Sequence, residues 1–177
     1  MKVFVMIDMQ NDFISGVFGN SETFAVLPKM IEKVRDLLKS DCKMFCTMDT
    51  HSENYMETQE GRNLPVPHCI KGTEGWEIHE ELKKVMDNIP SERRIEKNTF
   101  GAKNLPDKIL EICGEVPQEI ELAGVCTDIC VISNALLLKS FFPDTLITVN
   151  SKYCAGTSVE SHIRAIEAMK MCQINII

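Results

Sequence analysis

The chain has 177 residues, of which 44% are hydrophobic and 25% charged, so it has the size and composition of one globular domain spanning residues 1–177. Its formal net charge is −7 and its isoelectric point is near 5.1. This acidic balance argues against a nucleic acid or an anionic membrane as partner, because both bind basic surfaces, and it favours small-molecule chemistry.

The first apolar run, over residues 1–8, is too short to cross a bilayer, and no cleavage site of small residues follows it. It therefore predicts a buried first strand. The chain also has eight cysteines. In a chain of this length without an export signal, they favour reduced thiols in a cytoplasm over a disulfide scaffold.

Apolar residues recur at helical spacing over residues 22–39, with Glu and Lys between them, which predicts an amphipathic helix. Residues 43–48 predict a second strand that ends at Asp49. The stretch that follows, to about Gly75, contains Gly and Pro and has no sustained period. Loops of that length in a compact domain are usually functional.

The remainder alternates between the two kinds of pattern. Helices are predicted over residues 76–88, 105–113, 128–142 and 159–172, and strands over 93–97, 120–123, 146–149 and 174–177. Gly114 ends the helix before it. Strands that alternate with helices predict an α/β fold with a mostly parallel sheet covered on both faces.

In such a sheet, ligands bind beyond the carboxyl ends of the strands. Asp8 ends the first predicted strand, Asp49 the second and Lys97 the third, and Cys130 follows the fourth by one turn. Together they could supply a nucleophile, its base and an electrostatic stabiliser. Because Cys130 follows Gly124 at a strand-to-helix junction, helix N–H groups and the helix dipole favour its thiolate. The pattern predicts a cysteine hydrolase.

Each of these side chains also has an ordinary structural interpretation. Asp8 and Asp49 are equally typical of turns and helix caps, and Lys97 of a solvated lysine. Taken alone, Cys130 is as typical of a structural cysteine as of a nucleophile. We expect the role of a small buried hydrophobe for the other cysteines in apolar stretches, namely Cys42, Cys46, Cys113, Cys154 and Cys172.

Five motifs, in order along nearly the whole chain, decide between these interpretations. They are residues 7–13 (Ile-Asp-Met-Gln-Asn-Asp-Phe), 49–51 (Asp-Thr-His), 68–73 (His-Cys-Ile-Lys-Gly-Thr), Lys97 with Phe100, and 124–130 (Gly-Val-Cys-Thr-Asp-Ile-Cys). With these motifs the chain resembles the isochorismatase-type cysteine hydrolase superfamily, and within it is most similar to nicotinamidases and related amidohydrolases. The resemblance implies a three-layer α/β/α fold around a six-stranded sheet of Rossmann-type order.

The resemblance implies that Asp8, Lys97 and Cys130 form a catalytic triad. Asp8 would take the thiol proton, the Cys130 thiolate would attack an amide carbonyl, and Lys97 would hold the charges in register. Ammonia would leave, and water would hydrolyse the thioester. The backbone N–H groups of Cys126 and Cys130 would meet the oxyanion, and a cis peptide bond would join Val125 to Cys126.

The resemblance also implies a divalent metal. Its Asp-x-His pair falls on Asp49 and His51, and a later ligand falls on His68, although histidines in polar loops are ordinary when taken singly. The best match for a fourth ligand is Glu60, nine residues after His51, with a gap to His68 that is one residue longer than usual. Two imidazoles and two carboxylates suit Zn, Fe or Mn.

Phe13 and Phe100 match aromatic positions of the substrate pocket that the resemblance implies. Nicotinamidases usually place another aromatic ring three residues before the last ligand histidine, where it stacks on the pyridine, and here that position is Pro65. This departure weakens the case for nicotinamide itself and leaves the hydrolytic chemistry untouched.

We therefore expect a cysteine amidohydrolase that converts a small primary amide, nicotinamide as first candidate, to the acid and ammonia, as in NAD salvage. One alternative is a relative that acts on another amide, a carbamoyl compound or the vinyl ether of isochorismate, although members that cleave the vinyl ether lack the cysteine. Another is a module that only binds a small ligand. An apolar cluster at residues 136–138 and 141–142 could mediate a homo-oligomer.

Overall fold

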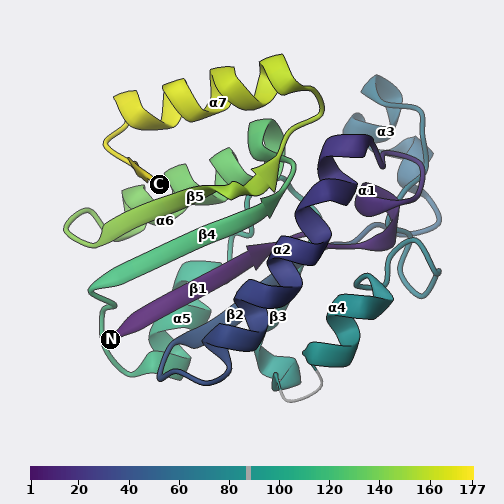
Figure 1. Ribbon diagram of the computed structural model, residues 1–177. Helices are drawn as coiled ribbons and strands as arrows, with labels where there is room; N and C mark the ends of the chain where they lie inside the picture. Colours follow the sequence, from purple (N-terminus) through teal and green to yellow (C-terminus); the bar gives the residue numbers. More distant parts are fainter. Residues whose placement is uncertain (87–88) are drawn as a thin grey trace.

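Six strands form one sheet in which every neighbouring pair runs parallel (Figure 1). The computed structural model describes residues 1–86 and 89–177. The strands are Lys2–Ile7 (β1), Lys43–Asp49 (β2), Arg94–Lys97 (β3), Glu119–Val125 (β4), Leu146–Ala155 (β5) and Asn175–Ile176 (β6). Their order across the sheet is β3-β2-β1-β4-β5-β6. The prediction of an α/β fold with Rossmann-type strand order is confirmed.

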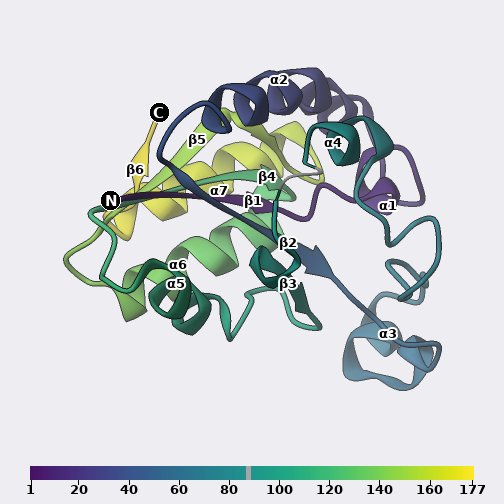
Figure 2. The ribbon, with the colours of Figure 1, turned by 90° about the horizontal axis from the view of Figure 1, so that it is seen from below.

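Helices cover both faces of the sheet, because each crossover between parallel strands carries the chain over one face. The main helices are Asn11–Ile14 (α1), Ser21–Leu37 (α2), Gln59–Asn63 (α3), Glu80–Val85 (α4), Leu105–Cys113 (α5), Ile132–Phe141 (α6) and Val159–Met171 (α7). Figure 2 shows α2 and α4 on one face and α5 and α6 on the other. Helix α7 contacts α6 and β6. The result is the expected three-layer arrangement.

The central strands are buried on both faces, as is typical of parallel strands between two helical layers. Residues 3–7 of β1 and 122–125 of β4 are all buried. Gly124 has a φ of +136°, and a Cβ atom there would lie 2.1 Å from the carbonyl oxygen of Ile7. Glycine is therefore required where the carboxyl ends of β1 and β4 approach each other.

Several predicted elements differ in extent from the observed ones. The helix expected over residues 76–88 is only Glu80–Val85, and residues 87 and 88 lie outside the described part of the chain. The predicted loop at residues 50–75 contains a 3₁₀ turn at Tyr55–Glu57 (η1) and the short helix α3. Strand β5 continues past residue 149 to Ala155, after a register shift against β4. Polar residues 150–152 conceal this extension in the sequence.

The helix expected over residues 128–142 is divided into two parts. Thr127–Val131 form a π-helical turn (η3), in which the Cys126 carbonyl oxygen accepts hydrogen bonds from the N–H groups of Ile129 and Val131. Helix α6 follows directly. Single π-helical turns are common at functional sites. Short 3₁₀ structure also precedes β3, at Ser91–Arg93 (η2).

Within residues 1–86 and 89–177, no helix is long and apolar enough to cross a membrane. The apolar cluster considered for self-association is only partly exposed. Leu138 and Phe142 are buried, Leu136 and Leu137 are half-buried, and Phe141 is exposed. The cluster is therefore not a continuous exposed apolar face, and a role in self-association stays a prediction without support from burial.

Candidate active site and metal centre

Asp8 directly follows β1, and its side chain is completely buried. Its φ of +47° lies in the left-handed region, which residues other than glycine seldom adopt. The Thr47 hydroxyl donates a hydrogen bond of 2.6 Å to Asp8 Oδ1, and Asp8 Oδ2 lies 2.8 Å from Lys97 Nζ. Burial raises the pKa of the Asp8 carboxyl, and the Lys97 ammonium offsets this only in part. A raised pKa makes the carboxylate a stronger base.

Lys97 ends β3, and its ammonium joins the acidic side chains to the thiol. Lys97 Nζ lies 3.2 Å from Asp49 Oδ1 and 3.5 Å from Cys130 Sγ, in addition to its contact with Asp8. Burial alone would lower the pKa of Lys97, but the surrounding negative charges raise it well above its ordinary value. Lys97 therefore stays a cation, suited to hold and stabilise charge.

Cys130 lies in the π-helical turn η3, behind the cis peptide bond between Val125 and Cys126 that the resemblance implied. Its thiol is nearly buried, with a residue exposure of 5%, and lines a cavity. Burial, together with the Asp8 carboxylate, raises the pKa of the Cys130 thiol well above its ordinary value, despite the Lys97 ammonium. Burial and the Asp8 charge therefore oppose the thiolate that the helix start was expected to favour, and they favour a protonated Cys130 in the free protein.

Asp49 ends β2 and connects the triad to a cluster of imidazoles. Its Oδ1 faces Lys97, while its Oδ2 lies 3.0 Å from His51 Nε2 and 3.4 Å from His68 Nε2. Burial alone would raise the pKa of Asp49, but hydrogen bonds from the two imidazoles and the charge of Lys97 hold it well below its usual range. Asp49 is therefore ionised.

The imidazoles and carboxylates converge as metal ligands do. The ligand atoms of Asp49, His51 and His68 all lie within 4.8 Å of one another. Glu60 Oε1 lies 3.8 Å from His51 Nε2 and 3.9 Å from His68 Nε2, so the carboxylate of α3 faces the same point. His68 Nδ1 lies 2.9 Å from the carbonyl oxygen of Val66, which can only accept a hydrogen bond. Nδ1 must therefore be the donor, and the neutral ring presents the Nε2 lone pair to the cluster.

These four side chains fit a divalent cation. Two imidazole nitrogens and two carboxylate oxygens form a common donor set for Zn, Fe or Mn. In the absence of a cation, burial lowers the pKa of His68, but the hydrogen bonds to Asp49 and Val66 and the charges of Asp49 and Glu60 together outweigh it and raise the pKa. A metal ion would take the place of that proton between imidazole and carboxylate.

A cavity of ≈ 250 Å³ opens above the thiol. Its polar lining is confined to few groups, among them Cys130, Asp49, Glu60 and His68, whereas most of its wall is apolar. The apolar wall consists of Phe13, Phe18, Leu64, Phe100 and Ile129. Both aromatic residues expected from the resemblance therefore line the cavity. Pro65 does not, and the structure places it on the exposed surface.

Phe18, in the loop between α1 and α2, lines the cavity although the sequence did not predict it as a pocket residue. Its ring centroid is 4.8 Å from that of His68 and 6.2 Å from that of Phe13, and it lies nearly parallel to Phe13 with an interplanar angle of 14°. The loop thus supplies an aromatic face where Pro65 supplies none. Nothing in the local sequence indicated this, because the loop path depends on tertiary packing.

Gln10 was also missed, although it belongs to the first motif. Its side chain is completely buried. Gln10 Nε2 donates to the carbonyl oxygens of Asp49 (2.8 Å) and Trp76 (2.7 Å), and Oε1 accepts from the N–H of Asp49 (2.7 Å). The amide therefore fixes the backbone of Asp49 from both sides. A glutamine just past a buried strand was the available signal.

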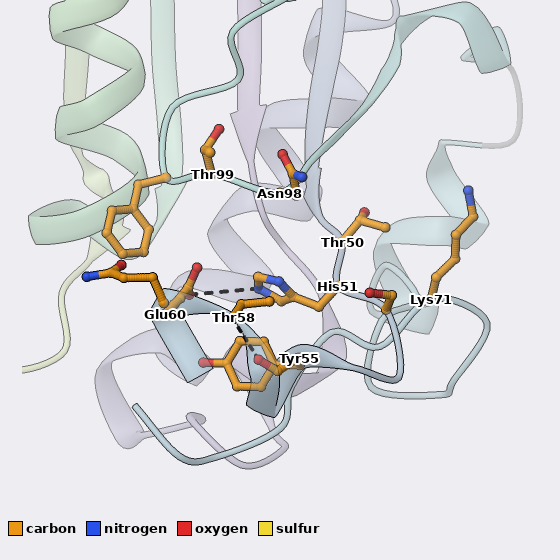
Figure 3. Close-up of a pocket in the computed structure, with 11 residues that line it drawn as sticks. Thr50, His51, Tyr55, Thr58, Glu60, Lys71, Asn98 and Thr99 are labelled. Carbon is orange, nitrogen blue, oxygen red and sulfur yellow. Dashed lines mark hydrogen bonds and ion pairs between the residues drawn. The ribbon is translucent and has the colours of Figure 1, made fainter. Parts of the chain in front are cut away.

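A second cavity, of ≈ 610 Å³, lies beside the first (Figure 3). It is lined mainly by polar side chains from residues 50–60, from Lys71 and from residues 98–99. Figure 3 shows the His51 ring and the Glu60 carboxylate facing each other at its floor. Glu60 and Phe100 line both cavities.

The other cysteines are all free, as expected. Cys46 and Cys154 are buried, and burial raises the pKa of each to about 12. Cys42 and Cys113 are half-buried. Cys172, predicted to be a small buried hydrophobe, is exposed at the end of α7, which corrects that expectation. Apolar neighbours in sequence do not bury a residue that follows the last helical turn.

The comparisons with known proteins agree with this geometry. Residues 2–177 match the family model of the isochorismatase domain. The chain is 27% identical to the nicotinamidase of Schizosaccharomyces pombe over 207 residues, which covers 98% of this chain and 91% of the relative. The structure of nicotinamidase PncA from Bacillus subtilis has a TM-score of 0.84 at 22% identity, covering 99% of this chain and 98% of that one. The pyrazinamidase of Pyrococcus horikoshii in complex with zinc has a TM-score of 0.80 at 25% identity, with the same coverage.

Proposed function

The chain belongs to the isochorismatase family, and from this membership we propose that it is a cysteine amidohydrolase acting on a small, flat primary amide, with nicotinamide as the first candidate. One observation carries the proposal. Lys97 Nζ lies 2.8 Å from Asp8 Oδ2 and 3.5 Å from Cys130 Sγ, and Cys130 lines a small, mostly apolar cavity. This convergence supports the roles of base for Asp8, fixed cation for Lys97 and nucleophile for Cys130.

The proposed reaction has two steps on Cys130. Asp8 takes the proton from the thiol, and the sulfur attacks the amide carbonyl carbon. Asp8 then returns the proton to the leaving nitrogen, the C–N bond breaks, and ammonia departs from a thioester. In the second step Asp8 takes a proton from water, whose oxygen attacks the thioester carbon. The C–S bond then breaks and Asp8 returns the proton to the sulfur, which releases the carboxylic acid and restores the thiol. Lys97 remains protonated and offsets the transient charge on sulfur and on Asp8.

We propose the backbone N–H groups of Cys126 and Cys130 as the donors to the oxyanion, and Asp49, His51, Glu60 and His68 as ligands of a divalent metal. When bound, the metal would supply a positive charge that orients a Lewis-basic atom of the substrate in the cavity. The zinc complex of the Pyrococcus horikoshii pyrazinamidase supports this assignment. Zn, Fe and Mn all suit the donor set.

The cavity wall supports an uncharged substrate. Among the described residues that line the cavity, none is Lys or Arg, and the acidic groups Asp49 and Glu60 face into it. Away from the proposed metal, a substrate carboxylate would be desolvated there without a cationic partner. This argues against isochorismate, which carries two carboxylates, and against carbamoyl compounds that carry one. Phe13, Phe18 and Phe100 favour a flat ring. A cytoplasmic role in nicotinamide salvage for NAD belongs to the same proposal.

Ammonia release from a panel of amides tests this function. We expect turnover of nicotinamide and pyrazinamide, weaker turnover of aliphatic amides, and none of amides that bear a carboxylate. Cys130→Ala should lower kcat by at least about a thousandfold. Cys172→Ala, which removes an exposed thiol outside both cavities, should leave kcat unchanged. Preferential hydrolysis of the anionic amides, or full activity of Cys130→Ala, would contradict the proposal.

A further inference from the structure

The proposed metal ligands lie between two cavities that differ in polarity, one walled mostly by apolar side chains and the other lined mostly by polar residues. Asp49, His68 and Glu60 line the apolar cavity above Cys130, and His51 and Glu60 line the larger polar cavity. Glu60 is the one member of this quartet that lines both, within the described residues. A cation held at this point would therefore border the cavity above Cys130 on one side and the polar cavity on the other.

Glu60 also differs from its three partners in how it is held. Its side chain is 21% exposed, whereas those of Asp49, His51 and His68 are 7%, 6% and 3% exposed. Its Oε1 lies 3.8 Å and 3.9 Å from the two imidazoles, while Asp49 Oδ2 lies 3.0 Å and 3.4 Å from them. It comes from the five-residue helix α3, which projects away from the sheet (Figure 2). Glu60 is the ligand with most freedom to withdraw.

A hydrated cation requires a polar path. Divalent ions give up their water reluctantly, and an apolar wall offers no oxygen atoms to replace it. The polar cavity is lined by hydroxyl and amide side chains, namely Thr50, Ser52, Thr58, Gln59, Asn98 and Thr99. Lys71 lies on its wall, but its ammonium is paired with Glu96 at 2.5 Å and so does not present an uncompensated positive charge.

We propose that the polar cavity is the path by which a hydrated divalent cation enters and leaves the site, and that Glu60 is the last ligand to close on it and the first to open. The substrate would thus use one opening and the metal another. A protein whose apolar cavity is occupied could still exchange its metal. The proposal rests on the metal site and not on the identity of the amide.

Stopped-flow exchange of Zn²⁺ with a chromogenic chelator tests the path, using the full chain. Gln59→Trp places a large side chain in the polar cavity at a residue that is not a ligand. We expect it to slow association and dissociation of Zn²⁺ by the same factor, about tenfold, so that the dissociation constant is unchanged. Asn63→Trp, on the same helix but lining neither cavity, is the matched control and should leave both rates unchanged.

Leu64→Trp is the converse variant, which obstructs the apolar cavity, because Leu64 lines that cavity and not the polar one. It should impair amide hydrolysis while leaving Zn²⁺ exchange unchanged. Glu60→Ala should speed dissociation more than it changes association. The proposal is overturned if Leu64→Trp slows exchange and Gln59→Trp does not, if neither does, or if the protein binds no Zn²⁺. Absence of amidase activity alone would overturn the proposed function and leave this one standing.

Discussion

At the scale of single residues, the raised pKa values suit a triad in which charge appears on sulfur only during the proposed reaction. The Cys130 thiol has a raised pKa because it is buried beside the Asp8 carboxylate, and the pKa of Asp8 is itself raised by burial. In the proposed mechanism, Asp8 and Cys130 therefore exchange one proton, while the Lys97 cation stabilises either arrangement. A protonated resting thiol also resists oxidation and alkylation.

This arrangement predicts opposite effects of one substitution on two measurements. In Asp8→Asn the negative charge that raises the pKa of Cys130 is gone while the Lys97 cation remains, so the pKa of the thiol falls. At neutral pH, alkylation of Cys130 by iodoacetamide should become about tenfold faster. Amide hydrolysis should be lost, because no base remains. Mass spectrometry of the Cys130 peptide across pH 6–10 measures the first effect.

A Cys172→Ala background removes the exposed thiol that would consume reagent, and Thr47→Val is a useful companion. It removes the hydrogen bond to Asp8 and keeps the carboxylate charge. Its alkylation rate should stay close to that of the parent protein. If Asp8→Asn slowed alkylation instead, Asp8 would be helping to form the thiolate in the resting state, and our account of Cys130 would be wrong.

The sequence predicted the types of reactive side chain better than their environment. Asp49 and Lys97 end strands, Asp8 directly follows one and Cys130 follows one by a turn, and strand ends can be located from hydrophobic patterning. Local sequence could not predict the pKa of Cys130, because burial and the approach of Asp8 depend on the packing of β1 against β4. The same applies to Phe18, which reaches the cavity from a loop.

At the scale of elements, Gln10 joins the ends of β1 and β2 to the segment around Trp76. Its three side-chain hydrogen bonds take the place of the backbone hydrogen bonds that one more pair of strand residues would have formed. Because two of them hold the backbone of Asp49, the carboxylate between triad and metal cluster depends on an amide two residues from Asp8. Gln10 is a positioning residue.

Gln10→Ala should lower the free energy of unfolding by about 2 to 5 kcal/mol, because buried N–H and C=O groups of Asp49 and Trp76 lose their partners. Urea unfolding measures this loss. Asn11→Ala, which removes an exposed hydrogen bond to the Glu74 carbonyl oxygen, should lower it by less than about 1 kcal/mol. Zn²⁺ affinity should fall in Gln10→Ala and not in Asn11→Ala. Equal losses in the two variants would contradict a specific role for Gln10.

Element prediction succeeded where periodicity is strong and failed where tertiary contacts define the backbone. The predicted helix at residues 105–113 coincides with α5, and β2 and β3 start and end within one residue of their predicted bounds. Helix α3 and turn η1 have too few residues to show a period. The π-helical turn was missed because its defining hydrogen bond to the Cys126 carbonyl gives no sequence signal.

At the scale of the whole molecule, the strand order places the ends of β1, β2 and β4 side by side although they are far apart in the chain. The long segment that connects β2 to β3 brings Glu60 and His68 close to Asp49 and His51. A metal bound by all four side chains would therefore cross-link this segment to the sheet, and the free energy of metal binding would add to the stability of the fold.

Zn²⁺ should consequently raise the thermal unfolding midpoint. At a free concentration about a thousandfold above the dissociation constant, the gain is about 4 kcal/mol, which corresponds to about 8 to 16 °C for a domain of this size. Calorimetry with Zn²⁺ and with chelator measures the difference. His51→Ala combined with His68→Ala should abolish it, whereas His79→Ala, outside the cluster, should retain it. A retained gain in the double variant would refute the ligand assignment.

The division of the Asp49 carboxylate, with one oxygen on Lys97 and the other on the imidazoles, makes this residue a shared junction. Substitution of Asp49 cannot separate metal dependence from the proposed activation of the nucleophile, because any replacement changes the contact to Lys97 and the contacts to the imidazoles together. A homologue that retains Asp49 but lacks His51 and His68 is expected to have lost the metal and kept the covalent chemistry. A homologue that lacks Asp49 is expected to have lost both.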